Sequence, residues 1–384
     1  MSPAATSPGK LGRVLGRIAG ERPGPTLIAI GGLHGNEPAG TIAAPRVIGR
    51  LEEGRFPLRG EFLAVVGNLG ALARGRRYRE FDLNRCWLPD NLARLQRQDP
   101  ALDRGEEREL RELARTVEEA RSRGGGPVTV IDLHTTSSHG PPFIVMSDTL
   151  RNRRLGLELL GTVFLGLEES VDGTLLEYMT EQGHTAVLVE GGQHEDPRSV
   201  EVHESVLWMA LAATGMLRPG EIPDLDRHRR FLRAAQRGTP RVVELRYRHD
   251  VRPGDGFRMK EGYLGFQEVK KGEVLARDRN GDVASPERGR IVMPLYQEQG
   301  EDGFFLVRPV NRFWMWVSRV VRRLRLGRVL PLLPGVSRIP GRPNALAVDP
   351  GKARFYAVEI FHLFGYRKRS REGERLVFTR RRPG

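Results

Sequence analysis

The sequence has little of what a disulfide-stabilised or membrane-spanning protein needs. Its 384 residues include one cysteine, Cys86, so neither a disulfide framework within the chain nor a zinc site built on several thiolates can form. No run approaches the roughly 18 to 20 apolar residues of a membrane span, and residues 1–20 lack the continuous apolar stretch of a secretory signal. We therefore expect a cytoplasmic protein.

The size and composition fit a folded protein with more than one domain. At roughly 150 residues per domain, the length predicts two to three domains. Hydrophobic residues make up 39% and charged residues 29% of the chain. This apolar content is enough for a sizeable core and argues against a wholly disordered chain.

The positive charge of the chain is concentrated near its C-terminal end. Residues 311–384 hold 18 Lys and Arg against 4 Asp and Glu, a difference that equals the net charge of +14 of the whole chain. Such a segment attracts polyanions such as nucleic acid or anionic lipid, although a solvated or packing segment is the plainer interpretation. Its aromatic residues could stack on bases or form the core of a small module. They are Phe313, Trp314, Trp316, Phe355, Tyr356, Phe361 and Phe364.

Short apolar runs alternate with helix-like stretches up to about residue 218. Runs that are typical of buried strands occupy residues 26–31, 62–66, 128–133 and 186–189. Stretches with helical spacing of apolar residues occupy 101–120, 150–160 and 199–217. The alternation predicts an α/β fold with a mixed central sheet flanked by helices.

The composition and the predicted secondary structure change twice along the chain, which predicts three parts. A segment rich in Pro and Gly at 218–226 reads as a linker, and short β-rich segments follow it. We expect an α/β domain over residues 1–218, a smaller all-β domain over 219–310 and a basic C-terminal extension over 311–384.

Polar side chains follow the ends of three predicted strands. His34 and Glu37 come in the HGNE motif after the first strand, His134 comes in DLHTT, and Glu190 directly follows the run at 186–189. Ligands of open α/β sheets bind beyond the carboxyl ends of the strands. We therefore expect these four side chains to converge.

The residue types suit a metal centre. His34 and Glu37 could bind one cation together and His134 could add a third ligand, a set that is ordinary for Zn²⁺ with a water in the fourth position. Zinc acidifies such a water, and Glu190 could take its proton and pass it to a leaving group. Taken singly, each motif has a plain alternative: a polar turn, a hydrogen-bonded histidine or a buried ion pair.

The order of these motifs resembles the succinylglutamate desuccinylase and aspartoacylase family. The sequence HGNE, then RY and DLNR, then DLHTT, then a strand-end Glu carries the resemblance, which covers about residues 12–310. That family belongs with the zinc carboxypeptidase-like α/β hydrolases. The resemblance implies one Zn²⁺ per chain held by His34, Glu37 and His134, with Glu190 as general base and then general acid.

The resemblance also implies substrate-binding residues. Arg77 matches an arginine that polarises the scissile carbonyl, and Asn84 and Arg85 match a pair that holds a substrate carboxylate. Tyr296 sits where the family offers a tyrosine toward the substrate. The implied reaction is hydrolysis of an N-acyl amino acid, so the expected partner is a small carboxylate-bearing acyl compound, and the β-rich part would narrow the channel to it.

The sequence departs from the family before the catalytic glutamate, and the family does not account for the basic extension after about residue 311. Aspartoacylases have a further arginine about ten residues before the catalytic glutamate, whereas Thr180 stands here, which argues against N-acetylaspartate as the substrate. Asp82 and Asp132 would orient Arg85 and His134.

Other chemistry is compatible with the same residues. Three histidines near the motifs, His139, His184 and His194, would line or flank the pocket. A peptidase of the carboxypeptidase kind would use the same zinc site. A polyanion-binding protein with a non-catalytic metal site is a third alternative, and the basic extension could also localise an enzyme.

Overall fold

We analysed a computed structural model of the chain, which describes residues 12–167, 170–349, 351–352, 357–373 and 375–380. Phe355 and Tyr356 of the basic extension lie outside these residues. Among the described helices, none combines the length and the apolar character that crossing a membrane requires.

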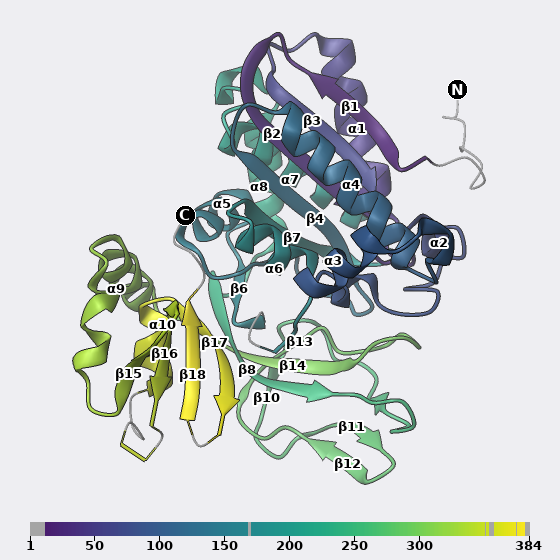
Figure 1. Cartoon of the computed structure of the whole chain (residues 1–384). Helices are drawn as coiled ribbons and strands as arrows, with labels where there is room; N and C mark the ends of the chain where they lie inside the picture. The colour runs from purple at the N-terminus through teal and green to yellow at the C-terminus, as the bar shows by residue number, and fades with distance from the viewer. Residues whose placement is uncertain (1–11, 168–169, 350, 353–356, 374, 381–384) are drawn as a thin grey trace.

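One large mixed sheet organises the molecule (Figure 1). Its strands follow the spatial order β1-β3-β2-β4-β7-β5-β6-β8-β14-β13-β10. They are β1 (Val14–Ala19), β2 (Arg22–Gly31), β3 (Arg59–Val66), β4 (Val128–Thr136), β5 (Phe143–Val145), β6 (Val163–Leu165), β7 (Thr185–Gln193), β8 (Val242–Asp250), β10 (Glu268–Val269), β13 (Gly289–Val292) and β14 (Asp302–Pro309). The four predicted apolar runs lie in β2, β3, β4 and β7, which are parallel to one another.

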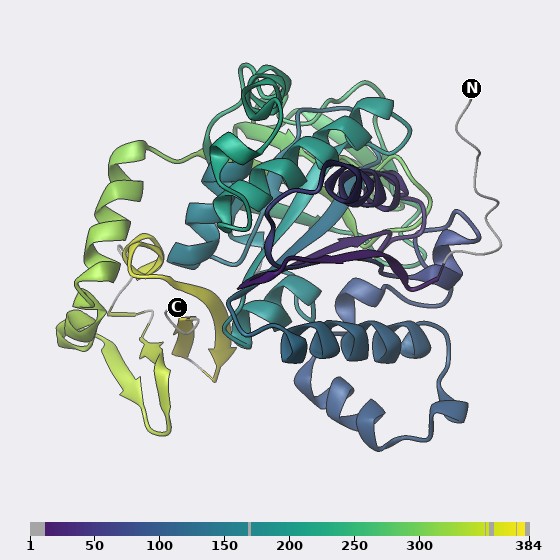
Figure 2. The same ribbon diagram turned by 90° about the horizontal axis from the view of Figure 1, so that it is seen from above.

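Helices cover both faces of the α/β part of this sheet (Figure 2). On one face lie α1 (Ala39–Gly54), α5 (Leu150–Leu159), α7 (Pro197–Ala213) and α8 (Leu225–Ala235). On the other lie α3 (Pro89–Arg97), α4 (Glu107–Arg123) and α6 (Leu175–Glu181), and the short α2 (Leu69–Leu72) follows β3. This arrangement confirms the predicted fold class of a mixed central sheet flanked by helices.

The apolar pattern explains why the layers form. In β2, successive side chains point to opposite faces, so Leu27 packs with the cluster under α1 and α7 while Ile28 packs with the cluster under α4. In α4, the buried residues Leu110, Leu113 and Val117 recur at helical spacing and turn one face to the sheet. Both faces of each central strand are therefore buried.

The β-rich part continues the large sheet. Strand β8 pairs in parallel with β6, and β14 and β13 follow in antiparallel order. A separate small sheet contains β9 (Arg258–Met259), β11 (Val274–Asp278) and β12 (Gly281–Ala284). Helix α8 was not predicted: it begins inside the expected linker and lies in the part expected to be all-β, and it buries Leu225 and Leu232 beside α7. The division of the chain at 218 and 310 stays a prediction.

The described residues of the basic extension fold into a small module, seen beside the β-rich part in Figure 1. It contains α9 (Arg312–Arg323), β15 (Val336–Ile339), β16 (Arg342–Val348), α10 (Ala357–Leu363), β17 (Tyr366–Glu372) and β18 (Arg375–Arg380). The four strands form an antiparallel sheet, and Phe361 and Phe364 pack in its core. Phe313, Trp314 and Trp316 instead are exposed on α9.

Candidate metal centre and active site

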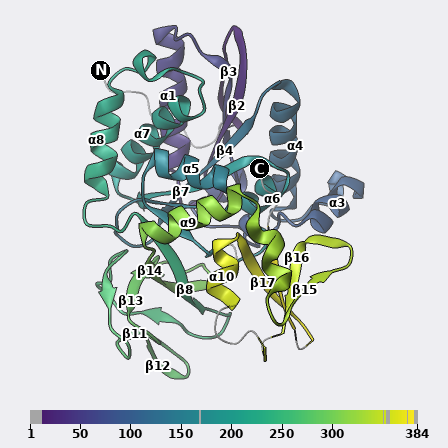
Figure 3. The same ribbon diagram turned by 90° about the vertical axis from the view of Figure 1, so that its left-hand side faces the viewer.

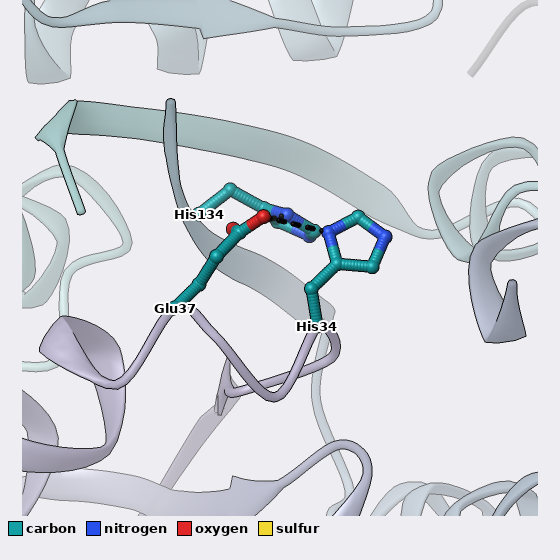
Figure 4. Close-up of side chains that lie close together, drawn as sticks. All are labelled: His34, Glu37 and His134. Atoms are coloured by element: carbon teal, nitrogen blue, oxygen red, sulfur yellow. Dashed lines mark hydrogen bonds and ion pairs between the residues drawn. The ribbon is translucent and has the colours of Figure 1, made fainter. Parts of the chain in front are cut away.

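The ends of β2 and β4 bring His34, Glu37 and His134 together, as Figure 4 shows. All three side chains are buried, and one ligand atom from each lies within 4.8 Å of the others. His34 Nδ1 is 2.8 Å from Glu37 Oε1, and His134 Nδ1 is 3.0 Å from Glu37 Oε2. Two imidazole nitrogens and a carboxylate thus face one another across a space that a cation could occupy.

A carboxylate lies close to the far nitrogen of each imidazole. His34 Nε2 lies 3.1 Å from Asp82 Oδ1, and His134 Nε2 lies 2.9 Å from Asp132 Oδ2. An imidazole whose outer N–H faces a carboxylate keeps its orientation and becomes a more basic ligand through the inner nitrogen. This pairing fits a metal site in which both Nδ1 atoms are ligands. Asp132 lies beside His134, and its role in orienting that imidazole stays a prediction. Asp82 contacts His34 as well as Arg77 and Arg85.

The electrostatics of the cluster also fit a cation. Burial opposes the ionised form of Glu37, but His34 and His134 hold the pKa of this carboxyl well below its usual range. Burial likewise disfavours the charged form of His134, yet Asp132 and Glu37 raise the pKa of its imidazole well above the usual value. The carboxylates therefore create a strongly negative site that favours positive charge between them.

The glycine of HGNE is required by close packing of the backbone. A Cβ atom at Gly35 would lie 2.1 Å from the carbonyl carbon of Ala71, much closer than real Cβ contacts. The Gly35 N–H donates to the carbonyl of Arg77 at 3.1 Å. The loop that carries two of the three metal-binding candidates is thus pressed against the segment that carries Arg77.

Glu190 lies in β7 at the register position beside His134 of β4. It is buried in the same pocket, and its Oε2 atom has no hydrogen-bond partner among the described residues. Burial raises the pKa of this carboxyl to about 8. Behind it, a Cβ at Gly191 would lie 2.5 Å from His203 Nε2, so the glycine allows that imidazole to donate to the His134 carbonyl.

Three of the predicted substrate-binding or polarising residues line the pocket: Arg77, Asn84 and Arg85. The Arg77 guanidinium donates to Asp82 at 3.1 Å and lies 3.6 Å from Glu37 Oε1. The side-chain Oδ1 of Asn84 accepts the Leu175 N–H at 3.0 Å. Arg85 is held by Asp302 of β14 at 3.2 Å.

The structure does not bring Tyr296 into the pocket. Its hydroxyl donates to the Lys260 carbonyl at 2.8 Å and accepts the Tyr263 N–H at 2.9 Å, so it is engaged inside the β-rich part. The residues on either side of it, Leu295 and Gln297, line the pocket instead. The side chains on both sides of Tyr296 therefore reach the pocket while Tyr296 does not, and sequence spacing does not reveal this.

A polar group that the sequence did not single out is Gln297. Its Oε1 accepts from Asn36 Nδ2 at 2.8 Å and lies 2.9 Å from His194 Nε2, so it ties the HGNE loop to the segment after β7. Of the three histidines expected near the pocket, His194 lines it, whereas His139 and His184 do not.

Much of the pocket wall is apolar. The apolar residues of the wall come from separate parts of the chain, so their spacing in the sequence does not predict that they line one pocket. They are Val145, Met146, Leu167, Val171, Leu176, Leu188, Met293, Leu295 and Phe305. Cys86 is not among the lining residues, and burial raises the pKa of its thiol to about 11, which leaves it a poor nucleophile.

Comparison with known proteins identifies the α/β part. Residues 23–204 match the model of the succinylglutamate desuccinylase/aspartoacylase catalytic domain. This part of the chain is a domain of that family. The match includes the HGNE loop, the DLHTT strand and Glu190, in agreement with the resemblance of the motifs.

A curated relative matches a short part of the chain, and solved structures share its fold. The succinylglutamate desuccinylase of Photorhabdus laumondii is 38% identical over 74 residues, which are 19% of this chain and only 23% of that protein. A succinylglutamate desuccinylase/aspartoacylase from Rhodobacter sphaeroides has the same fold, with a TM-score of 0.57, 18% identity and coverage of 78% of this chain and 88% of that one. Murine aminoacylase 3 matches with a TM-score of 0.52, 19% identity and coverage of 76% and 97%.

Proposed function

We propose that the protein is a zinc-dependent hydrolase that cleaves the amide or ester bond of a small N-acyl amino acid-like compound. The observation that carries the proposal is the buried group of His34, Glu37 and His134 beside the unpartnered carboxylate oxygen of Glu190. The desuccinylase/aspartoacylase family to which the domain belongs supports the same reaction class.

The residues present suit zinc and a single Zn²⁺ per chain. His34, Glu37 and His134 would hold it, and when bound it supplies a positive charge that polarises a carbonyl oxygen and acidifies water. Asp82 and Asp132 would keep the two imidazoles in position. Other divalent ions accept the same ligand types, so the metal itself has to be measured.

The chain's own groups would carry the protons and the developing charge. Glu190 would take a proton from the attacking water and return it to the leaving nitrogen or oxygen. Arg77 would face the carbonyl oxygen as negative charge develops there. Asn84 and Arg85 would hold a carboxylate of the substrate.

The pocket favours a substrate with one carboxylate and an apolar group. Arg85 already contacts Asp302, and Thr180 takes the place of the extra arginine of aspartoacylases. The remaining wall is largely aliphatic, with Phe305 at one side. An acidic side chain would lose its hydration there without gaining a partner, whereas an apolar group would be stabilised.

The glutamate variant Glu190→Gln tests the mechanism. It should retain about one zinc per chain and lose activity by about 10²- to 10⁴-fold, because it cannot move the proton. Metal content and turnover should be measured on the same preparation, beside His134→Ala, which should lose the metal. Full activity in Glu190→Gln would contradict the proposed role.

A panel of substrates tests the compound class. We expect N-acyl amino acids with apolar side chains to be cleaved faster than N-acetylaspartate and than peptides with free C-termini. Faster shortening of the peptides would favour the carboxypeptidase alternative. Zinc binding without turnover of any compound, together with salt-sensitive binding to nucleic acid, would favour the polyanion-binding alternative.

A further inference from the structure

Helix α9 exposes apolar side chains that a helix of a folded domain normally turns toward the core. Its apolar residues Phe313, Val317, Val320 and Leu324 recur at helical spacing and form one stripe. Phe313 and Leu324 at the two ends of the stripe are 57% and 63% exposed, and Val317 and Val320 between them are half-buried. The helix crosses the front of the molecule in Figure 3, where none of the described helices and strands lies over it.

Buried polar contacts fix this orientation. Arg322 donates to Asp148 Oδ2 at 2.8 Å, and Ser318 donates to the Leu363 carbonyl at 2.7 Å. Asp148 is completely buried, so a partner on the inner side of α9 is needed to offset its desolvation. The helix therefore buries the side chains of Ser318 and Arg322 and leaves Phe313 and Leu324 of its apolar stripe exposed.

The exposed apolar side chains extend beyond the stripe. The helix continues into a short 3-10 segment, η6 (Leu326–Leu332), where Leu332 is 83% exposed. We call this set of exposed residues the α9 surface. It consists of Phe313, Trp314, Trp316, Leu324, Leu326, Val329 and Leu332. A cluster of this kind marks an interaction site on a soluble protein.

Arginines border the α9 surface. A groove between α5 and α9 is lined by six arginines and one acidic residue, Glu158, which pairs with Arg154. The arginines are Arg153, Arg154, Arg241, Arg312, Arg319 and Arg323, and Trp316 lies among them. Arg312, Arg319 and Arg323 form no ion pair with any residue that the structure describes. Their charges are therefore available to an external anion.

We propose that the α9 surface binds the headgroup region of an anionic lipid bilayer, with the helix lying in the plane of the membrane. Exposed tryptophans and aliphatic residues flanked by arginines are the composition of an interfacial helix. A second copy of the chain would bring the same arginines face to face, and nucleic acid offers no apolar phase to the leucines and Val329. The anionic bilayer satisfies both the charge and the apolar residues.

The tryptophans provide a direct test. The chain has four, and Trp87 and Trp208 are buried in the core, so a change in emission on adding vesicles reports on Trp314 and Trp316. Vesicles of phosphatidylcholine mixed with phosphatidylserine should shift the tryptophan emission to the blue, and the protein should co-sediment with them on centrifugation. Binding should weaken with salt and be much weaker with phosphatidylcholine alone.

Two variants separate the apolar and the charged contributions. Phe313→Ser with Trp316→Ser should weaken vesicle binding at least about tenfold, and Arg312→Gln with Arg319→Gln and Arg323→Gln about 100-fold. The control Leu88→Ser with Leu102→Ser changes exposed apolar residues on a different surface and should bind like the wild type. Unchanged thermal unfolding and zinc content would show that each variant is folded.

Three results would overturn the proposal. One is unchanged tryptophan emission of the wild type with anionic vesicles at low salt. Another is a dimer in sedimentation experiments that the Phe313→Ser and Trp316→Ser variant cannot form, because it would assign the surface to a second copy. The third is binding of single-stranded nucleic acid, lost in the same variant, with no binding to vesicles.

Discussion

At the scale of single residues, the carboxylates behind the imidazoles set the strength of the metal centre. Asp132→Asn keeps the size of the side chain beside His134 but removes its charge. We expect zinc affinity to fall by about 10- to 100-fold, since the imidazole loses basicity. Competition with a chelator measures this directly. Asp302→Asn, which alters the pocket wall without touching a proposed metal ligand, should leave the affinity unchanged, and an equal loss there would argue for a general charge effect.

Gly35 offers a test of packing next to the site. Gly35→Ala would force its Cβ against the Ala71 backbone, so we expect a loss of about 1–3 kcal/mol in the free energy of unfolding together with weaker zinc binding. Gly49→Ala is the matched control, because nothing lies within 4 Å of a Cβ there and alanine suits the interior of α1. Urea unfolding measures the free energy of unfolding of both variants. Equal values for the two would show that the HGNE loop can move to accept the added Cβ atom at residue 35.

Residues that follow directly from strand ends were predictable from the sequence, and residues supplied by loops were not. His34, Glu37, His134 and Glu190 each lie at or just beyond an apolar run, so their convergence follows from the geometry of a parallel sheet. Gln297 reaches the pocket from an irregular connection, whose path no periodicity encodes.

At the scale of elements, one buried carboxylate joins the C-terminal module to the α/β part. Asp148 meets Arg153, Arg322 and Arg367, so Asp148→Asn would leave three arginines around a neutral group. We expect a loss of about 3–5 kcal/mol in the free energy of unfolding and easier proteolysis before α9. Glu158→Gln, which removes an exposed ion pair with Arg154, should cost less than about 1 kcal/mol. A similar loss of unfolding free energy in the two variants would show that the Asp148 cluster does not attach the C-terminal module to the α/β part.

Helices and strands were predictable where the apolar residues of a segment follow a single pattern of spacing. The runs that became β2, β3, β4 and β7 are continuous and apolar because both of their faces are covered. The predicted helix at 101–120 begins only at Glu107, since Pro100–Leu102 form a 3-10 turn and Gly105 takes a positive φ of 49°. Helix α9 shows a clear apolar stripe, yet the ion pair under it, and not the stripe, decides which side is buried.

At the scale of the whole molecule, stability should depend on pH through carboxyls at the junction of the module. Burial opposes ionisation of Glu244, but His362 and Arg367 lower the pKa of its carboxyl to about 2. The unfolded chain, with a pKa of about 4.3, binds the proton first, so this stabilisation is complete above that value and is lost as the pH falls toward 2. The free-energy difference between wild type and Glu244→Gln in urea unfolding should be larger at pH 6 than at pH 3. A difference that does not change with pH would contradict this assignment.

The continuity of the large sheet has a consequence for how a substrate is selected. Phe305 and Asp302 of β14 line the pocket. Strand β14 pairs with β8 and β8 pairs with β6, while β5 lies between β6 and β7, the strand that carries Glu190. That wall cannot swing away as a hinged lid without breaking backbone hydrogen bonds of the sheet. The protein would then select substrates by the preformed shape of its pocket, and not by closing a lid over the bound substrate.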